Sequence, residues 1–236
     1  ERNIPYLLRS SRTQRRGHGR HDDRGITMDT RIRKIIKILQ KMYPNPKPFL
    51  RFQSPFESLV ATILSAQCTD QRVNMVTPAL FAAANTPQKM LALGRKKLVS
   101  YIKSTGFFNA KAKNILGASR TLIKNYGGKV PADMEELQKL PGVGRKTASV
   151  VLSQSFHIPA FPVDRHVFRV ANRLALAKAK DPEKTDLQLR KNIPEKLWIP
   201  LHIQLISHGR NICRPSPKCP VCPLLPYCPE GTRRTR

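Results

Sequence analysis

The sequence predicts an all-α protein, and three observations lead to that prediction. Apolar residues recur at helical spacing in successive segments, the first of which places Ile32, Ile35, Ile36, Leu39 and Met42 on one face. No segment alternates apolar and polar residues over more than a few positions, as a half-buried strand would. Residues that cap helices, often followed by proline, precede the periodic segments. With 236 residues and 40% hydrophobic content, the chain is long enough to bury a sizeable core.

The beginning of the chain is basic, and clear helix boundaries follow it. Residues 1–27 are rich in Arg, Ser, Gly and His and have no hydrophobic period, so we expect a basic disordered extension there. The first helix is expected from Asp29 to Met42, and a proline-rich link ends it. Ser54 is expected to cap the next helix, because Pro55 suits the first helical position and Glu57 completes a capping box.

The rest of the chain shows the same kind of boundary. Further helices are expected to begin at Thr69 and at Thr86, to cover Lys97–Thr105 up to Gly106, and to span residues 109–125. We expect the remaining helices to begin at Asp133, Gly144, Asp164, Asp181 and Pro200, the last of them ending near Gly209. Residues 229–236 are expected to form a basic tail.

The charge of the chain indicates a polyanionic partner. It carries 43 Lys and Arg against 15 Asp and Glu, a formal net charge of +28. Such a charge favours nucleic acid first and an acidic membrane surface second. No apolar run approaches the roughly 20 residues of a membrane span, and the start lacks the apolar segment of a secretory signal. We therefore expect no membrane association.

A glycine-rich turn between two expected helices is the first chemical motif. Leu140–Thr147 reads LPGVGRKT, and it predicts a helix–hairpin–helix over about residues 133–155. Backbone N–H groups beside a helix N-terminus bind anions, so we expect Gly142, Val143 and Gly144 to donate to DNA phosphate, with further contacts from Arg145 and Thr147. The alternative is an ordinary turn between helices, but the net charge and the lysine that follows favour the DNA-binding interpretation.

Lys146 and Asp164 are the candidate catalytic pair. A lysine near a helix N-terminus is expected to have a lowered pKa and to act as a nucleophile, which can attack a sugar C1′ and form a Schiff base. A carboxylate nearby can stabilise the cationic sugar or move protons. The alternatives are a solvated lysine and an aspartate that only caps its helix.

Four cysteines near the end of the chain predict a metal centre. Their spacing is C-x5-C-x2-C-x5-C, at Cys213, Cys219, Cys222 and Cys228. The spacing alone permits a tetrathiolate zinc or an iron–sulfur cluster. Disulfides are the weaker alternative, because the chain shows no secretion signal. Cys68 stands apart and is not expected to be a ligand.

These motifs together resemble the endonuclease III family of helix–hairpin–helix DNA glycosylase/AP lyases. The resemblance rests on LPGVGRKTA, PVDRHVFRV, HGR-x2-C with the cysteine cluster, and SPFESLVATILSAQCTD, and it covers about residues 28–228. It implies two helical domains that flank a DNA-binding cleft. One is a six-helix domain over 51–163, and the other joins 28–50 to 164–228 and holds a 4Fe-4S cluster on the four cysteines.

The resemblance also implies roles for single residues. Lys146 matches the Schiff-base lysine of the family, and Asp164 matches its catalytic aspartate. Gln67 matches a glutamine that fills the space left by the extruded nucleotide, and Phe107 falls where the family places an apolar wedge. His166 and Lys218 are expected as further DNA contacts. Arg210, Arg214 and Lys218 are expected to add positive charge beside the cysteine cluster, which allows contact with phosphate.

The implied activity is base-excision repair of duplex DNA. The family resemblance implies a bifunctional enzyme that removes oxidised pyrimidines and cleaves abasic sites by β-elimination, acting as a monomer in the bacterial cytoplasm on the nucleoid. Arg214–Lys218 is a departure, because it gives five residues between the first two cysteines where the family usually has six. The alternatives are an adenine-mismatch glycosylase of the same superfamily, which lacks the lysine, and a non-catalytic DNA-binding or redox-sensing iron–sulfur protein.

Overall fold

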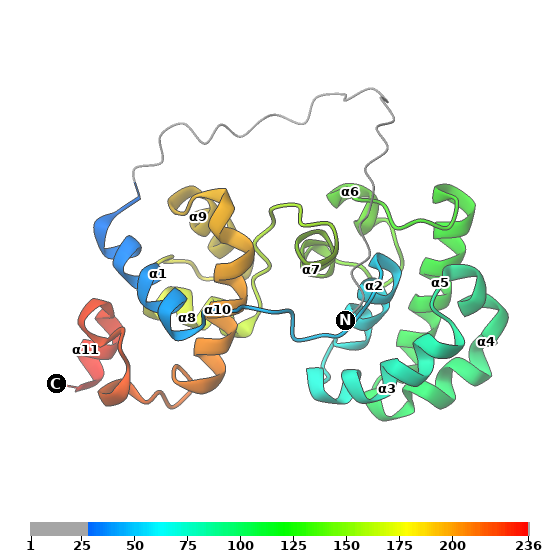
Figure 1. The fold of residues 1–236 in the computed structure, drawn as a ribbon, viewed down its shortest axis with the longest axis horizontal. Helices are drawn as coiled ribbons and strands as arrows, with labels where there is room; N and C mark the ends of the chain where they lie inside the picture. The colour runs from blue at the N-terminus through cyan, green and yellow to red at the C-terminus, as the bar shows by residue number, and fades with distance from the viewer. Residues whose placement is uncertain (1–27, 236) are drawn as a thin grey trace, which may run out of the picture.

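The computed structural model describes residues 28–235, and all the regular structure in that range is helical (Figure 1). The predicted all-α fold is confirmed. The expected basic extension at residues 1–27 lies outside the described residues, and so does Arg236.

The helices have the following order and bounds. They are α1 (Thr30–Met42), α2 (Pro55–Leu64), α3 (Asp70–Ala83), α4 (Pro87–Ile102), α5 (Phe108–Tyr126), α6 (Met134–Gln138), α7 (Arg145–Ser155), α8 (Arg165–Arg173), α9 (Pro182–Asn192), α10 (Trp198–Asn211) and α11 (Pro229–Thr235). Short 3₁₀ turns follow α4 at Lys103–Thr105 and precede α10 at Glu195–Leu197.

Side-chain caps begin most of these helices, as predicted. The capping residues are Asp29, Ser54, Thr69, Thr86, Asp133, Asp164 and Asp181, each of which accepts a hydrogen bond from an N–H of the first turn. At α2, Ser54 Oγ accepts from the Glu57 N–H at 3.2 Å, while Glu57 Oε2 accepts from the Gln53 N–H at 2.7 Å. The Glu57 carboxylate thus accepts from the N–H of Gln53, the residue before the cap, whereas in a capping box it would accept from the N–H of Ser54 itself.

Three boundaries differ from the prediction. The segment expected at Lys97–Thr105 belongs to α4 as far as Ile102, and its last three residues form a 3₁₀ turn. Gly94 interrupts α4 before this segment with a φ of +74°, a conformation that glycine adopts easily. The helix expected at Pro200 begins at Trp198, because the preceding 3₁₀ turn leads the chain into it. It is also not the last helix, since α11 follows with Glu230 paired to Arg233 and Arg234.

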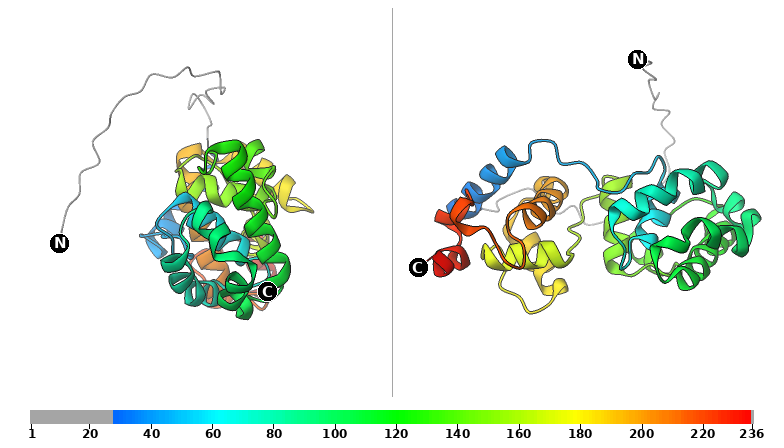
Figure 2. Two further views of the ribbon diagram at one scale, coloured as in Figure 1. Left: turned by 90° about the vertical axis from the view of Figure 1, so that its right-hand side faces the viewer. Right: turned by 90° about the horizontal axis from the view of Figure 1, so that it is seen from below.

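The buried apolar side chains form two cores, which we call the first core and the second core. The first core holds residues between Leu50 and Ala160, from α2 to α7. The second combines Ile32–Leu39 of α1 with residues of α8 to α10 and the cysteine-rich segment. Figure 1 and the right panel of Figure 2 show the two halves side by side, joined by the segment after α1 and the segment between α7 and α8.

Within residues 28–235, no helix combines the length and apolar character that a membrane crossing would require.

Candidate active site and cysteine cluster

A cavity of about 220 Å³ lies where the two cores meet. Its walls come from the end of α2, the start of α3, α7, the start of α8 and α10. The polar side chains that line it include Gln67, Asp70, Lys146, Asp164, His202 and Arg210. Gln67, Asp70 and Lys146 come from the part of the chain that forms the first core. His202 and Arg210 come from α10 of the second core, and Asp164 lies at the junction, where α8 begins.

The structure brings Lys146 and Asp164 to this one cavity. Lys146 is the second residue of α7 and is exposed, whereas Asp164 is half-buried at the start of α8. Asp164 Oδ1 accepts from the N–H groups of His166 and Val167, both at 2.8 Å. Both capping bonds use one oxygen, so Oδ2 of the carboxylate is not occupied by the cap.

His202 on α10 is a third titratable group in the cavity, and no motif in the sequence pointed to it. The side chain is 3% exposed, and its Nδ1 has no hydrogen-bond partner in the described part of the chain. Burial lowers the pKa of His202 to about 4, against an opposing effect of Asp164, while Lys146 lowers it further. The imidazole is therefore neutral at neutral pH, and it adds a polar but uncharged group between an amine and a carboxylate.

The hairpin that precedes α7 has two free N–H groups. The Val143 N–H donates to the Leu140 carbonyl at 3.1 Å and closes the turn, and the Val143 side chain is buried. Gly142 has a φ of +78°, and a Cβ there would lie 2.7 Å from the Asn114 side chain. The N–H groups of Gly142 and Gly144 have no acceptor within residues 28–235.

The start of α7 also lacks a side-chain cap, because Gly144 occupies the capping position. The first N–H groups of a helix point along its axis and carry partial positive charge. At the start of α7 no side chain caps these N–H groups, so they are available to an external anion. Arg145 turns away to pair with Asp186 of α9 at 3.1 Å, and Thr147 lines the cavity.

Gln67 and Phe107 share a rare backbone conformation. Their φ angles are +51° and +48°, and the only other non-glycine residues with positive φ in residues 28–235 are His157 and Ala175. Both side chains are exposed, Phe107 by 64%. Gln67 lies between α2 and α3, and Phe107 lies directly before α5, which begins without a side-chain cap. Such strain costs about 1–3 kcal/mol per residue and is often found at functional sites.

Lys111 supports the loop that carries Phe107. Its side chain is only 4% exposed, and its Nζ donates to the Thr105 carbonyl at 2.8 Å. Burial lowers the pKa of Lys111, while a nearby Cys68 acts in the opposite direction. Lys111 therefore supports the segment before Phe107 through the Thr105 carbonyl, and its amine also lies near Cys68, the residue after Gln67. Sequence reasoning missed it, since a lysine in an amphipathic helix is normally solvated.

An ion pair joins the two sides of the cavity. Arg210 of α10 pairs with Asp70, the first residue of α3, and its guanidinium lies 4.2 Å from the centre of the Phe49 ring. Arg210 was expected to add charge to the cysteine cluster, and the structure places it in the cavity instead. The residues are 140 positions apart, so no local signal could have paired them.

The four cysteines near the C-terminus line one small pocket. Gly231 N–H donates to Cys228 Sγ at 3.2 Å, and His208 Nε2 lies 3.6 Å from Cys222 Sγ. Burial raises the pKa of the Cys222 and Cys228 thiols. All four are free thiols in the structure. Cys68 packs at the edge of the first core, apart from them.

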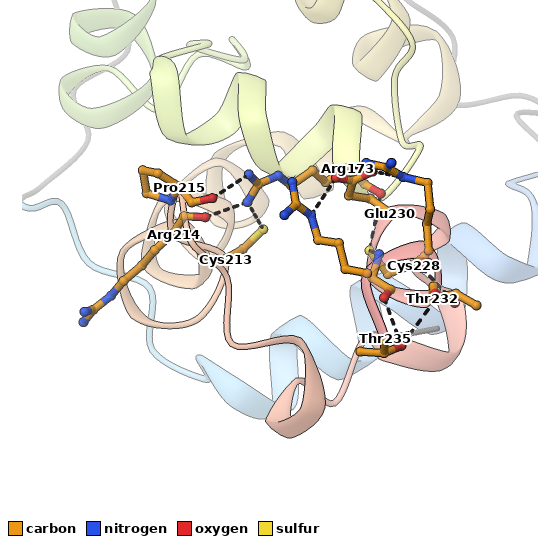
Figure 3. Close-up of polar contacts among 11 residues, drawn as sticks. Arg173, Cys213, Arg214, Pro215, Cys228, Glu230, Thr232 and Thr235 are labelled. Atoms are coloured by element: carbon orange, nitrogen blue, oxygen red, sulfur yellow. Dashed lines mark hydrogen bonds and ion pairs between the residues drawn. The ribbon is translucent and has the colours of Figure 1, made fainter.

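Two arginines of α8 hold the loop that follows Cys213. Figure 3 shows Arg173 reaching the Arg214 carbonyl at 2.6 Å, the Pro215 carbonyl at 3.0 Å and Cys213 Sγ at 3.6 Å. Arg169 donates to the Cys213 carbonyl at 2.9 Å and also contacts His166 Nδ1 at 3.2 Å.

These two arginines therefore fix the short segment between the first two cysteines on the surface of α8. Of the two candidate contacts, Lys218 is the last residue of this segment, and His166, at the start of α8, contacts Arg169. Lys218 is exposed, and burial lowers the pKa of His166.

Comparison with known proteins places the chain in a family. Residues 60–195 match the model of the HhH-GPD superfamily base excision DNA repair protein. Endonuclease III of Rickettsia conorii is 50% identical over 198 residues, which are 84% of this chain and 94% of that protein. Endonuclease III of Escherichia coli K12 is 43% identical over 196 residues, 83% of this chain and 93% of that protein.

Solved structures agree with this assignment. The structure of a non-covalent endonuclease III–DNA complex superimposes with a TM-score of 0.83 at 44% identity, covering 89% of this chain and 100% of that chain. A trapped endonuclease III–DNA covalent intermediate gives the same values. A thermostable thymine-DNA glycosylase shares the fold, with a TM-score of 0.76 at 22% identity. The predicted resemblance is confirmed, and the chain belongs to the endonuclease III family of base excision DNA repair enzymes, which are DNA glycosylases and AP lyases.

Proposed function

We propose that this protein is a bifunctional DNA glycosylase/AP lyase that removes oxidised pyrimidines from duplex DNA and cleaves the resulting abasic site. The observation that carries the proposal is the cavity between the two cores, to which α7 brings the amine of Lys146 and α8 brings the carboxylate of Asp164. The solved relatives named as endonuclease III–DNA complexes support duplex DNA as the substrate.

The two side chains are suited to a Schiff-base mechanism. The free amine of Lys146 attacks the sugar C1′, and the bond from C1′ to the base breaks, so that the base leaves with the electron pair. Ring opening gives an imine, loss of a proton from C2′ follows, and the C3′–O bond breaks by β-elimination. Asp164 stabilises positive charge on the sugar or takes up the amine proton, and its Oδ2, which the cap does not use, is the atom available for this role.

The hairpin is the proposed binding site for the DNA backbone. The N–H groups of Gly142 and Gly144 and the uncapped start of α7 offer donors to one phosphate. Val143 anchors the turn instead, because its N–H is used within the hairpin and its side chain is buried. Arg145 and Thr147 lie beside this binding site, in the first turn of α7. His166 and Lys218 are proposed as further contacts on the side of the second core.

Gln67 and Phe107 are the proposed residues that enter the DNA stack. An enzyme that acts on a base in a duplex must extrude it, at a cost of a few kcal/mol. Both side chains are exposed on backbone held at positive φ, so the backbone is already ordered before insertion, and less entropy is lost on binding. The support that Lys111 gives to the Thr105 carbonyl favours the same role for the Phe107 loop.

The four cysteines fit a 4Fe-4S cluster, which we propose as the cofactor. Four soft thiol donors line one pocket whose other walls include apolar side chains, and no disulfide links them. When bound, the cluster would cross-link the segment from Cys213 to Cys228. Absorbance near 400 nm in anaerobically purified protein tests this assignment, and a colourless protein containing zinc would contradict it.

We further propose that the two cores are two domains, 51–163 and 28–50 with 164–228, and that the protein acts as a monomer on chromosomal DNA in the bacterial cytoplasm. The two clusters of buried side chains support two domains, with the boundaries slightly before residues 51 and 163, because Leu50 belongs to the first core and Phe161 and Val163 belong to the second. The bacterial relatives support the setting. The molar mass in solution, with and without duplex DNA, tests the monomer.

Borohydride trapping tests the proposed chemistry. The wild-type protein should form a covalent adduct with duplexes that contain an oxidised thymine or an abasic site, and Lys146→Gln should abolish the adduct. Lys139→Gln, which changes another exposed lysine near the hairpin, is the matched control and should trap normally. Undiminished trapping by Lys146→Gln would overturn the proposal.

The same assay separates the alternatives. A monofunctional adenine-mismatch glycosylase would release mispaired adenine without an adduct. A non-catalytic DNA-binding protein would bind the duplex and neither release a base nor trap. The exposed lysine amine in the cavity favours the bifunctional reaction over both.

A further inference from the structure

One continuous stretch of the chain, in the half of the molecule that contains the first core, has no acidic residue. Residues 71–132 contain 11 Lys and Arg and no Asp or Glu. This stretch covers α3 beyond its first residue, all of α4 and all of α5. The left panel of Figure 2 looks toward this end of the molecule. The positive charge of this surface is therefore not balanced by acids of its own helices, in contrast to α9 and α11, where lysine and arginine pair with nearby carboxylates.

A groove of about 390 Å³ collects part of this charge between α4 and α5. Its lining includes Arg95, Asn109, Lys113 and Arg120, and it includes no carboxylate. Arg95 donates to Asn109 Oδ1 at 3.0 Å, which ties the guanidinium of α4 to α5. Arg95, Lys113 and Arg120 are exposed, and none of them forms an ion pair with a carboxylate of residues 28–235. We call this the α4–α5 groove.

The α4–α5 groove and the hairpin share helix α5. A Cβ built on Gly117 would lie 3.1 Å from the Pro141 ring, and Asn114 is the side chain that approaches Gly142, so the hairpin packs directly on α5. Lys113 and Arg120 lie on the neighbouring face of the same helix, since residues three or four apart share a face and residues one apart are turned by about 100°. An extended polyanion that contacts the hairpin therefore has a second set of positive charges within reach along α5.

We propose that the α4–α5 groove is a second phosphate-binding site, which binds the backbone of the duplex outside the segment held by the hairpin and the cavity. The proposal rests on the proposed function in taking duplex DNA as the ligand. Two guanidinium groups and an ammonium group without acidic neighbours match a run of phosphates, and arginine in particular binds phosphate through two parallel hydrogen bonds. The contact reads no sequence, because it reaches only the backbone.

The test is the salt dependence of binding to an undamaged duplex of about 30 base pairs, measured by fluorescence anisotropy. The groove variant combines Arg95→Gln, Lys113→Gln and Arg120→Gln. The matched control combines Arg33→Gln, Lys37→Gln and Lys41→Gln, exposed residues of α1 at the opposite end of the molecule (Figure 1). A third variant, with Arg95→Lys, Lys113→Arg and Arg120→Lys, keeps the charge and shows whether a loss in binding comes from charge or from folding.

Each phosphate neutralised by the protein contributes about 0.9 to the slope of log K against log salt. The groove variant should therefore show a slope smaller by about 2 to 3, while the control and the charge-conserving variant stay near the wild type. Base release from a lesion duplex at saturating protein should be unchanged in the groove variant. A groove variant with the slope of the control would overturn this inference alone, whereas a wild-type protein that binds no duplex would overturn the proposed function.

Discussion

Two helices that line the same cavity, α7 and α8, begin in opposite ways. Helix α7, from the first core, starts at Gly144 without a side-chain cap and carries Lys146 in its first turn. Helix α8 starts at Asp164, whose carboxylate accepts from two N–H groups of its own first turn. The first helix leaves its donors open to an external anion, and the second uses them to hold an anion that belongs to the protein.

The difference explains why the reactive groups come from separate halves. An uncapped helix start suits phosphate binding, and the role proposed for the lysine beside it is to reach the sugar of a nucleotide bound there. A carboxylate needs fixed donors to stay in place, and the cap at α8 supplies them. Each side of the cavity then depends on further support: Lys111 in the first core, and His202 and Arg210 in the second.

The largest expected effect comes from removing the charge of Asp164 without removing its cap. Asn caps helices about as well as Asp, so Asp164→Asn should leave the start of α8 in place. Base release under single-turnover conditions should slow by about 10²–10⁴-fold, because a positioned acid or base contributes that much, while DNA affinity should change by only a few-fold. Rapid-quench measurement of base release and anisotropy measure the two quantities.

A matched change separates the two roles further. Asp164→Ala removes the cap as well and should cost about 1 kcal/mol of stability in addition. Equal losses of DNA binding and base release in Asp164→Asn would mean that Asp164 is only a structural cap.

The next effect concerns the support of the first-core side. Lys111→Met leaves the Thr105 carbonyl without its buried donor, which should destabilise the protein by about 1–3 kcal/mol. Because that bond also fixes the loop before Phe107, lesion binding should weaken more than binding to undamaged duplex. Urea denaturation and competition binding check this, with Lys103→Met, an exposed lysine of the same loop, as the control. Identical losses for damaged and undamaged DNA would contradict the positioning of Phe107.

The second-core side should be sensitive to acid through His202. Burial holds the pKa of His202 at about 4, below its usual 6.5, so between these values the unfolded chain binds a proton that the folded chain does not. This contribution to stability is complete above pH 6.5 and is lost as the pH falls toward 4, by about 2 kcal/mol between pH 7 and pH 5.

Urea denaturation at the two pH values should therefore show a smaller loss for His202→Asn than for the wild type. His157→Asn changes an exposed histidine and should keep the wild-type dependence. An unchanged loss in His202→Asn would show that this imidazole is already protonated in the folded state at pH 5.

The smallest expected effect is that of the ion pair between Asp70 and Arg210, which links the two sides. The Arg210 side chain is 38% exposed and that of Asp70 is 22% exposed, so solvent screens the pair. A double-mutant cycle with Asp70→Asn and Arg210→Gln should give a coupling free energy of unfolding of about 0.5–1 kcal/mol. Additive effects of the two substitutions would show that the pair does not hold the halves together.

Local signals explain how much of this could be predicted from the sequence. Ser54, Thr69, Asp133 and Asp164 cap the helices that follow them because a cap acts within three residues of itself. The predicted family also brought Lys146 and Asp164 to attention, and the structure places both in one cavity.

What the sequence missed depends on residues that are far apart along the chain. The pairing of Arg145 with Asp186, and that of Arg210 with Asp70, require the two halves to be packed first. The burial of Lys111 depends on the loop folded over it. The break at Gly94 could not be predicted, because a glycine in a helical pattern can either continue the helix or interrupt it at positive φ.

The central claim is that the amine at the uncapped start of α7 forms the bond to the sugar. The most direct measurement is peptide mapping by mass spectrometry of the wild-type protein after borohydride reduction with an abasic duplex. The sugar remnant should be attached to Nζ of Lys146. A remnant attached to any other lysine, or to the N-terminal amine, would contradict the claim.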